Sequence, residues 1–302
     1  MKWKKIGLII EFQKELDWMR THAMLPISDP MGGSLFRVYF CGRDDQNRSH
    51  IGFAVIDMDR EGKVLEYSKK AVLSPGELGC FDDNGVSPSW ILNHENKKFL
   101  YYIGWKPRST TRMGLIAGLA VSEDGGLTFN RISRAPILRL TDKEPFMILT
   151  APCVLKEGSL WKMWYVSGFK WEHADLPCYN IKYAESQNGV DWNQPGTVCI
   201  ESPLGNETSL ARPCVFKDEG AYKMFYSYKR DGNPYRIGYA ESPDGIKWTR
   251  KDEEVEMDVS QSGWDSEMIE YAYIFPYKKR KYMLYNGNGY GLTGAGLAVL
   301  EG

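Results

Sequence analysis

The hexapeptide WKMWYV, residues 161–166, has the aromatic-rich pattern typical of a buried β-strand. Related stretches recur at Leu35–Phe40 (LFRVYF), Lys98–Ile103 (KFLYYI), Tyr222–Ser227 (YKMFYS) and Lys281–Asn286 (KYMLYN). Aligned on Phe40, Tyr102, Tyr165, Tyr226 and Tyr285, they are spaced by 62, 63, 61 and 59 residues. Repeats of this length built from short strands are typical of a propeller or a solenoid.

Two further strand patterns keep step with these core strands. One precedes each core, at Ala23–Ser28, Gly85–Leu92, Thr150–Leu155, Ala211–Phe216 and Glu270–Phe275. The other follows each core, at Ile51–Asp57, Ile116–Ser122, Asn180–Ser186, Arg236–Ser242 and Gly294–Leu300. With a more variable fourth strand, each repeat is a four-stranded antiparallel blade. We therefore predict an all-β, five-bladed β-propeller that forms a single domain over residues 1–302.

In three of the repeats the third strand leads into a hairpin turn. SEDGG (Ser122–Gly126), SQNG (Ser186–Gly189) and SPDG (Ser242–Gly245) follow the third strand, and each is followed by an aromatic that opens the fourth. The last repeat lacks a fourth strand, and WKKIGLII at Trp3–Ile10 resembles one. We predict that this N-terminal strand completes the last blade and closes the ring, which removes exposed sheet edges.

Composition narrows the function class. The chain has 302 residues, 43% of them hydrophobic, and a net charge of −1, which is typical of a soluble protein with no electrostatic attraction for nucleic acid. No apolar run approaches the roughly 18 residues of a membrane span, and no export signal is recognisable. The six cysteines form no CxxC or metal-type spacing. We expect a cytoplasmic protein without a metal, a cofactor, a membrane span or a nucleic-acid partner; the oligomeric state is left open.

One face of the predicted propeller carries the variable segments. The loops from the second to the third strand and the links between blades are long and differ in every repeat, whereas the turns on the opposite face are short and repetitive. Variation confined to one face of a regular scaffold indicates a functional site there.

Acidic residues gather on that face, just before the innermost strands, at Asp82, Asp83, Glu207, Asp265, Glu267 and Glu270. Carboxylates around one pocket suit glycosidic chemistry, because one can protonate the leaving oxygen while another acts as base or nucleophile. Asp83 or Asp82, together with Glu270 or Glu267, are the acid/base candidates. The alternative is that these acids only cap turns or pair with nearby arginines.

Further side chains on this face are candidates for substrate binding. Trp105, Trp171, Trp264 and Tyr290 offer flat platforms for a sugar ring, and Arg43, Arg212 and Arg236 offer clamps for an anion or a hydroxyl. The remaining binding candidates are His22, Asp44, His50, Glu207, Asp265, Asn286 and Asn288. Loop packing, neutralisation of the acids and ordinary hydrogen bonding are the structural alternatives for these residues.

One turn matches the Asp-box pattern S-x-D-x-G-x-T-F. Ser122–Phe129 (SEDGGLTF) fits it and resembles the turns of sialidases. Those boxes lie away from the catalytic site, and sialidases have six blades where five repeats are present here. The resemblance therefore concerns folding of the turn.

The inner strands carry a proline near their centre at Pro26, Pro88, Pro152 and Pro213, and repeats such as YAESPDGIKW (Tyr239–Trp248) recur. In these features the whole chain resembles the five-bladed glycoside hydrolase superfamily, which includes families 32, 43, 62 and 68 and the phosphorylases of family 130. The resemblance implies a carbohydrate substrate and a funnel site formed by acids from several blades.

The family's acids are not found at the matching positions. In families 32 and 43 an Asp directly before a Pro in the first inner strand acts as nucleophile or base, whereas Leu25 stands there in this chain. Ser87 and Thr150–Ala151 occupy the corresponding places in the next two repeats. The resemblance therefore does not carry the family's catalytic triad over to these residues.

The chain also looks similar to uncharacterised five-bladed proteins of bacterial surface-polysaccharide clusters, through GELGCFDDNGVSPSW, GWDSEM and YNGNGYG. That likeness implies a role in making or trimming a polysaccharide. The leading hypothesis is an enzyme that acts on a glycosidic bond of a small or oligosaccharide substrate, as hydrolase, phosphorylase or transferase. The alternatives are a non-catalytic sugar-binding propeller and, less favoured by the acid- and Trp-rich loops, a platform for protein partners.

Overall fold

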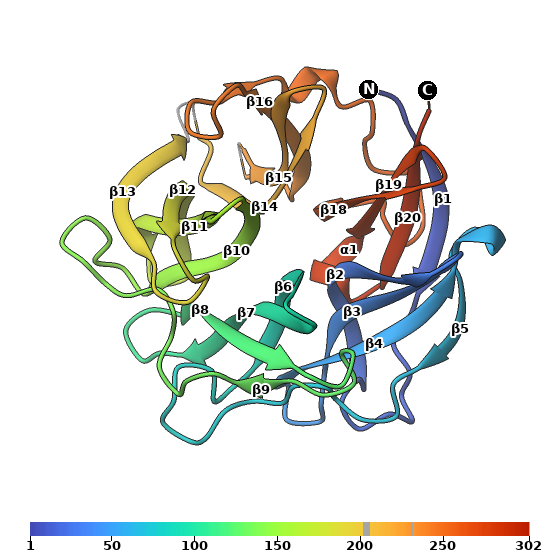
Figure 1. Cartoon of the computed structure of the whole chain (residues 1–302), viewed down its shortest axis with the longest axis horizontal. Coiled ribbons are helices and arrows are strands. Elements are labelled where there is room, and N and C mark those ends of the chain that lie inside the picture. Colours follow the sequence, from blue (N-terminus) through green and yellow to red (C-terminus); the bar gives the residue numbers. More distant parts are fainter. Residues whose placement is uncertain (202–205, 231, 302) are drawn as a thin grey trace.

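In the computed structural model of the chain, which describes residues 1–201, 206–230 and 232–301, nearly all regular structure is β-strand. The first antiparallel sheet has the order β2-β3-β4-β5. Its strands are β2 (Thr21–Gly32), β3 (Leu35–Arg43), β4 (Ser49–Asp57) and β5 (Lys63–Tyr67). The predicted all-β class is confirmed, and the arrangement of its strands is propeller-like (Figure 1).

The middle of the chain forms three antiparallel groups that are joined by short parallel pairings of β8 with β10 and of β12 with β14. The first group is β6 (Val86–His94), β7 (Lys97–Pro107), β8 (Met113–Ser122) and β9 (Asn130–Arg131). The second is β10 (Ile148–Glu157), β11 (Leu160–His173), β12 (Leu176–Ser186) and β13 (Asn193–Ile200). The third is β14 (Ser209–Asp218), β15 (Ala221–Lys229), β16 (Arg236–Ser242) and β17 (Thr249–Arg250).

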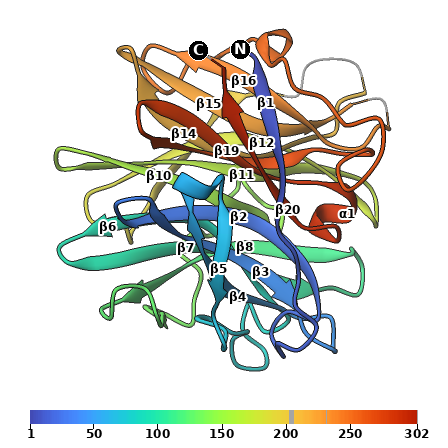
Figure 2. The ribbon, with the colours of Figure 1, turned by 90° about the vertical axis from the view of Figure 1, so that its right-hand side faces the viewer.

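The last sheet joins the two ends of the chain. It has the order β1-β20-β19-β18, with strands β1 (Trp3–Ile10), β18 (Glu270–Tyr277), β19 (Arg280–Asn286) and β20 (Ala295–Leu300). β1 pairs antiparallel with β20, as the sequence predicts, and Figures 1 and 2 place the two termini close together. The short helix α1 (Asn288–Gly291) lies in the loop between β19 and β20.

Aromatic side chains hold neighbouring strand groups together. An aromatic residue at or just before the start of four outer strands packs on the second strand of the preceding group: Phe129 on Tyr39, Trp192 on Tyr101, Trp248 on Trp164 and Trp3 on Phe225, with ring centroids 5.6 to 6.3 Å apart. Such edge-to-face pairs add to the free energy gained by burying the rings. The placement of Trp3 among them explains why the N-terminal segment matches the other fourth strands.

The Asp-Gly and Asn-Gly turns are also inter-sheet contacts. The Tyr39 hydroxyl donates to the carbonyl of Gly126 at 2.9 Å, and Tyr101 does the same to Gly189 at 2.9 Å. Gly126 has φ +92°, and a Cβ there would lie 2.0 Å from the Tyr39 hydroxyl. Glycine is therefore required at this turn both for its backbone conformation and for the close approach of the tyrosine.

The inner strands β2, β6, β10, β14 and β18 surround the centre of the molecule (Figure 1). Most of the buried side chains form one continuous hydrophobic cluster that runs through all the sheets. Within the described part of the chain, no helix has the length and apolarity needed to span a bilayer.

Candidate functional site

The inner strands share a bulge at the centre of the fold. In β2, β10, β14 and β18 the pairing with the next strand shifts register, and the shifted segment contains a residue with left-handed backbone: Leu25, Ala151, Arg212 or Tyr271, with φ between +48° and +58°. Non-glycine residues in this conformation are strained and are common near functional sites. All four of these residues line one cavity.

This central cavity has a volume of about 330 Å³. Its floor comes from the bulges, and Ser87 of β6 takes the corresponding place in the second group. Every loop from a second to a third strand contributes to its wall, for example Arg43, Trp105, Asp175, Tyr235 and Tyr290. The cavity thus opens within the variable loops that the sequence singles out, and its size suits a small sugar or a drug-sized ligand.

Four of the sequence candidates line the cavity: Arg43, Trp105, Arg212 and Tyr290. Trp105 and Tyr290 face it together with Tyr179, Tyr235 and Tyr271, which the sequence analysis did not select. The Lys229 ammonium lies 4.5 Å from the ring centre of Tyr235 and donates a 2.6 Å hydrogen bond to the Tyr290 hydroxyl. The wall on this side is therefore aromatic with a polar edge, as sugar sites often are.

Arg212 crosses the floor of the cavity. It is only 1% exposed, and its Nη2 donates to the carbonyls of Pro26 in β2, at 3.4 Å, and of Ser89 in β6, at 3.3 Å. Its Nη1 has no hydrogen-bond partner among the described residues, and neither does the buried hydroxyl of Thr150. Both residues line the cavity, and buried polar atoms without a partner call for an explanation.

Glu270, at the start of β18, is completely buried. Neither of its carboxyl oxygens has a hydrogen-bond partner among the described residues. Burial raises the pKa of this carboxyl well above its usual range, which the positive charge of Lys229 and the neighbouring Tyr271 side chain only partly offset. A charge on Glu270 would in turn act on Tyr235 and Tyr271, which both line the cavity. Burial thus favours the protonated form of Glu270.

We expect Glu270 to make folding stability fall as the pH rises. Because the pKa of Glu270 is raised in the folded chain, its contribution to stability is complete below the ordinary pKa of 4.5 and is lost as the pH rises toward the folded value. Glu270→Gln should therefore unfold at a higher urea concentration than wild type at pH 8, with the difference vanishing toward pH 4.

The matched control is Glu144→Gln, which changes an equally buried glutamate that is held by the Tyr165 hydroxyl at 2.9 Å and by Lys182 at 3.5 Å. This variant should be less stable than wild type at both pH values. A Glu270→Gln variant whose stability relative to wild type does not change with pH would contradict the assignment.

Other acids selected from the sequence belong to a repeated structural cluster. In four of the strand groups a tyrosine hydroxyl of the second strand donates to a carboxylate that also binds a cation: Tyr102 with Asp82 and Arg131, Tyr165 with Glu144 and Lys182, Tyr226 with Asp252 and Arg250, and Tyr285 with Asp265 and Lys5. Asp82 and Asp265 are buried in these clusters and do not line the cavity.

Glu207 and Asp83 are likewise engaged in ion pairs outside the cavity lining. Arg250 holds both oxygens of Glu207, at 2.7 and 2.9 Å, in a bidentate pair. Asp83 accepts from Lys106 at 2.8 Å and from the Gly79 amide at 2.8 Å. Although burial disfavours the charged form of Asp83, these bonds hold its pKa below the usual value. Its neighbour Asn84 faces the cavity instead.

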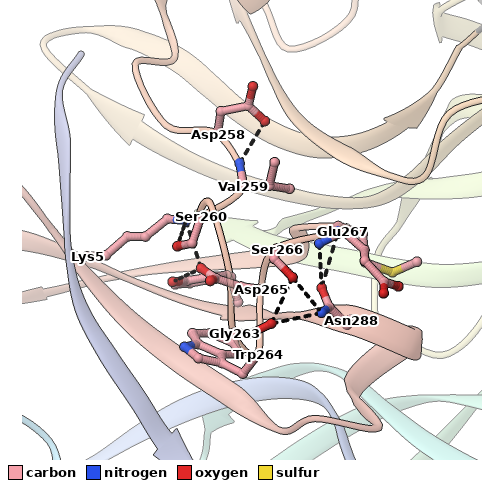
Figure 3. A network of polar contacts seen from close by, with 12 residues as sticks. Lys5, Asp258, Val259, Ser260, Gly263, Trp264, Asp265, Ser266, Glu267 and Asn288 are labelled. Carbon is pink, nitrogen blue, oxygen red and sulfur yellow. Dashed lines mark hydrogen bonds and ion pairs between the residues drawn. The ribbon is translucent and has the colours of Figure 1, made fainter.

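The segment before β18 forms a polar network of its own (Figure 3). Asp265 points toward Lys5, at 2.7 Å, while the Asn288 amide accepts from the Glu267 backbone and donates to the Gly263 carbonyl. The Glu267 side chain is exposed, and Trp264 packs on Tyr285 at 5.1 Å. None of these residues lines the cavity.

The remaining candidates do not line the cavity. Burial and the charge of Arg43 lower the pKa of His22 to about 4, so its ring is neutral at pH 7. His50 contacts Asp44 at 3.0 Å, and Arg236 pairs with Asp258 at 2.7 Å. Trp171 packs against a small apolar cluster that includes the cavity residues Ile103, Ile148, Ala151 and Val166.

Asn286 supports the cavity from β19. Its Oδ1 accepts from the Leu25 amide at 2.7 Å, and its Nδ2 donates to Ala23 at 2.7 Å. Asn286 therefore fixes the bulge of β2. Ser227 does the same for β18, because its hydroxyl accepts from the Tyr271 amide at 2.7 Å. Across the described ranges, no group of three or more His, Cys, Asp or Glu side chains is placed to hold a metal ion.

Comparison with known proteins gives two relatives along the whole chain. No family model matches. The proteins MT1551 and Rv1502 of Mycobacterium tuberculosis, both described as uncharacterized, are each 41% identical over 302 residues, which is 100% of this chain and of the relative.

Several solved structures with a similar fold are glycoside hydrolases. A glycosyl hydrolase from Bacteroides ovatus has a TM-score of 0.76 and 12% identity, over 99% of this chain and 93% of its own. A family-130 structure, described among mannoside phosphorylases and hydrolases of β-1,2-mannosidic linkages, has a TM-score of 0.72 and 14% identity over 99% and 93%. The family-32 β-fructofuranosidase of Bombyx mori has a TM-score of 0.67 and 14% identity over 96% and 63%.

These neighbours confirm the resemblance to the propeller glycoside hydrolase superfamily that the sequence indicates. At 12 to 18% identity the likeness extends to the fold alone.

Proposed function

The chain belongs to the same family as the Mycobacterium tuberculosis proteins MT1551 and Rv1502, and since their names state no activity, we propose from its own cavity that it is a carbohydrate-active enzyme acting on a glycosidic bond. The observation that carries this proposal is the central cavity, where strained bulges, aromatic rings and unpartnered polar atoms converge. Sites of this composition bind sugars by stacking and by directed hydrogen bonds.

The proposal includes the finer architecture. The strand groups beginning with β2, β6, β10, β14 and β18 are five blades of one propeller domain, and β1 closes the ring by completing the last blade. Pairing of β1 with β20 and the packing of Trp3 on Phe225 support this. The six cysteines are free, which supports a reducing compartment such as the cytoplasm.

Glu270 is the acid in this proposal. Burial raises the pKa of Glu270 and so favours its protonated form, and we assign to it the proton for the leaving glycosidic oxygen, passed on through the Tyr235 and Tyr271 hydroxyls that line the cavity. Asp175 is exposed and is the one carboxylate among the described residues that line the cavity. We assign to it the stabilisation of positive charge on the sugar or the activation of water.

A sugar-binding protein without catalysis is the second candidate. It is favoured by one observation: Leu25, Ser87 and Thr150, which line the cavity where the superfamily places acids, carry no carboxyl group. Binding would then rest on the aromatic wall formed by Trp105, Tyr235 and Tyr290.

The two candidates are separated by a ligand screen. Free sugars, sugar phosphates, nucleotide sugars and inorganic phosphate are tested for thermal stabilisation, and each ligand found is followed for consumption by chromatography. We expect at least one glycoside to stabilise the chain and then be consumed. Trp105→Ala should weaken its binding about tenfold, because stacking of the ring is lost.

Ligand binding without consumption would leave the sugar-binding candidate, and the absence of binding by any sugar would remove both. Trp18→Phe provides the control for Trp105→Ala, since Trp18 is buried against Phe40 outside the cavity, with ring centroids 5.4 Å apart.

A further inference from the structure

The charges that line the central cavity are unbalanced. Among the described residues that line it, Arg43, Arg112, Arg212 and Lys229 are basic, whereas only Asp175 is acidic. The whole chain, by contrast, is nearly neutral, with 38 basic and 39 acidic residues. Positive charge is therefore concentrated at the cavity and is not a general property of the surface.

None of these four cations has an acidic partner among the described residues. No carboxylate of a described residue lies within 4.0 Å of Arg43, Arg112, Arg212 or Lys229. Several part-buried cations outside the cavity are neutralised, as Arg131 is by Asp82, Arg250 by Glu207 and Lys106 by Asp83. Arg212 is buried, and because an unpaired buried charge is costly, its retention in the cavity calls for a reason.

Arg212 is the strongest of these observations. Its guanidinium is buried on the cavity floor, where two carbonyls take hydrogen bonds from Nη2 and nothing described takes one from Nη1. A guanidinium presents its donors in a fixed fork that matches the two oxygens of a carboxylate or phosphate. The cavity floor thus offers an oxyanion a charged donor that water reaches poorly.

Arg43 and Arg112 also line the cavity, where their two positive charges act on each other. Arg43 donates to the Asn47 side chain at 3.0 Å, and its pKa is lowered by burial and by the positive charge of Arg112. Repulsion between two guanidinium groups is relieved when an anion binds between them. The Arg112 backbone, bonded to the Ala174 carbonyl at 2.8 Å, is held at this position of the rim.

We propose that the cavity binds an acidic sugar, in which a carboxylate or phosphate group carried by the sugar is recognised by Arg212, Arg43 and Arg112. The aromatic wall of Trp105, Tyr235 and Tyr290 then holds the ring of the same molecule. This inference rests on the proposed function, because it takes the cavity to be the sugar site. It adds that an anionic substituent is a required part of the substrate.

The test is titration calorimetry of the full chain with matched ligands: glucose, glucuronate, glucose 6-phosphate, glucose 1-phosphate and inorganic phosphate. We expect at least one acidic sugar to bind ten times or more tightly than glucose and than inorganic phosphate, with a preference that weakens as salt is raised. The uronate and the phosphates distinguish the two kinds of oxyanion.

Arg43→Gln and Arg112→Gln should each weaken binding of the acidic sugar about tenfold, since each removes a charge-assisted hydrogen bond. Both variants should change glucose binding less than threefold. These two side chains are part-exposed or exposed, so the variants are expected to fold. Lys170→Gln is the matched control, because Lys170 lies in β11 on the same side but is paired with Glu172 at 2.7 Å. This substitution should change the affinity for the acidic sugar less than twofold.

Equal binding of acidic and neutral sugars, or no effect of either arginine substitution, would overturn the acidic-sugar inference and leave the proposed function standing. Inorganic phosphate that binds as tightly as any sugar phosphate, with no binding of glucose or glucuronate, would overturn both.

Discussion

Replacing Glu270 with glutamine is expected to reduce turnover of a bound glycoside by about 10²- to 10⁴-fold while changing its binding less than threefold. Glutamine fills the same space in the buried site at the start of β18 but has no proton to give. The leaving oxygen would then depart without protonation. The measurements are the rate of product formation and, separately, the dissociation constant by calorimetry.

The pH profile distinguishes a role in proton transfer from a purely structural one. Wild type should lose activity on the alkaline side as Glu270 gives up its proton, because burial raises the pKa of this group. The residual activity of Glu270→Gln should lack that limb. Glu144→Gln provides the control, since Glu144 is as buried but belongs to the cluster of Tyr165 and Lys182. Unchanged turnover in Glu270→Gln would remove the proposed acid.

The strands could be predicted because the same sequence pattern occurs in every repeat. Taken alone, the segment 161–166 does not decide its secondary structure, but its recurrence at nearly fixed intervals indicates a strand. In the structure this segment is part of the longer strand β11. The match of Trp3 with Trp192 and Trp248 predicted a long-range pairing of β1 with β20, since these aromatics pack in the same way on the preceding sheet. Repetition supplies the long-range information that a single segment lacks.

The candidate site was less predictable, because a carboxylate before an inner strand has two fates. Asp82 and Asp265 precede β6 and β18 as Glu270 does, yet a tyrosine of the neighbouring strand and a distant cation engage both. Those partners, Arg131 and Lys5, lie 49 and 260 residues away in sequence. Only the folded structure shows which acid is left without a partner.

Arg112 and the tyrosines of the cavity wall were missed for a related reason. Arg112 stands in a loop, GWKPRSTTRMG, that also contains Arg108, and the sequence does not say which arginine turns inward. The bulges that bring Arg212 and Tyr271 into the cavity depend on register shifts between paired strands. Such shifts have no local signal when the strained residue is not glycine.

The largest expected loss of stability comes from Asp82. Asp82→Ala should lower the free energy of unfolding by about 3–5 kcal/mol, because it leaves the Arg131 guanidinium and the Tyr102 hydroxyl without their acceptor in a site where the carboxylate is 1% exposed. Asp83→Ala, one residue on, should lower the free energy of unfolding by less, because Lys106, the partner of Asp83, is 35% exposed and can turn to water.

The free energies are measured by urea unfolding of the two alanine variants and of Tyr102→Phe. Tyr102→Phe should lose about 1–2 kcal/mol, since a single hydrogen bond is removed. Two alanine variants of equal stability would contradict the cluster's structural role. An Asp82→Ala variant that unfolds like wild type but no longer turns over substrate would return Asp82 to the catalytic site.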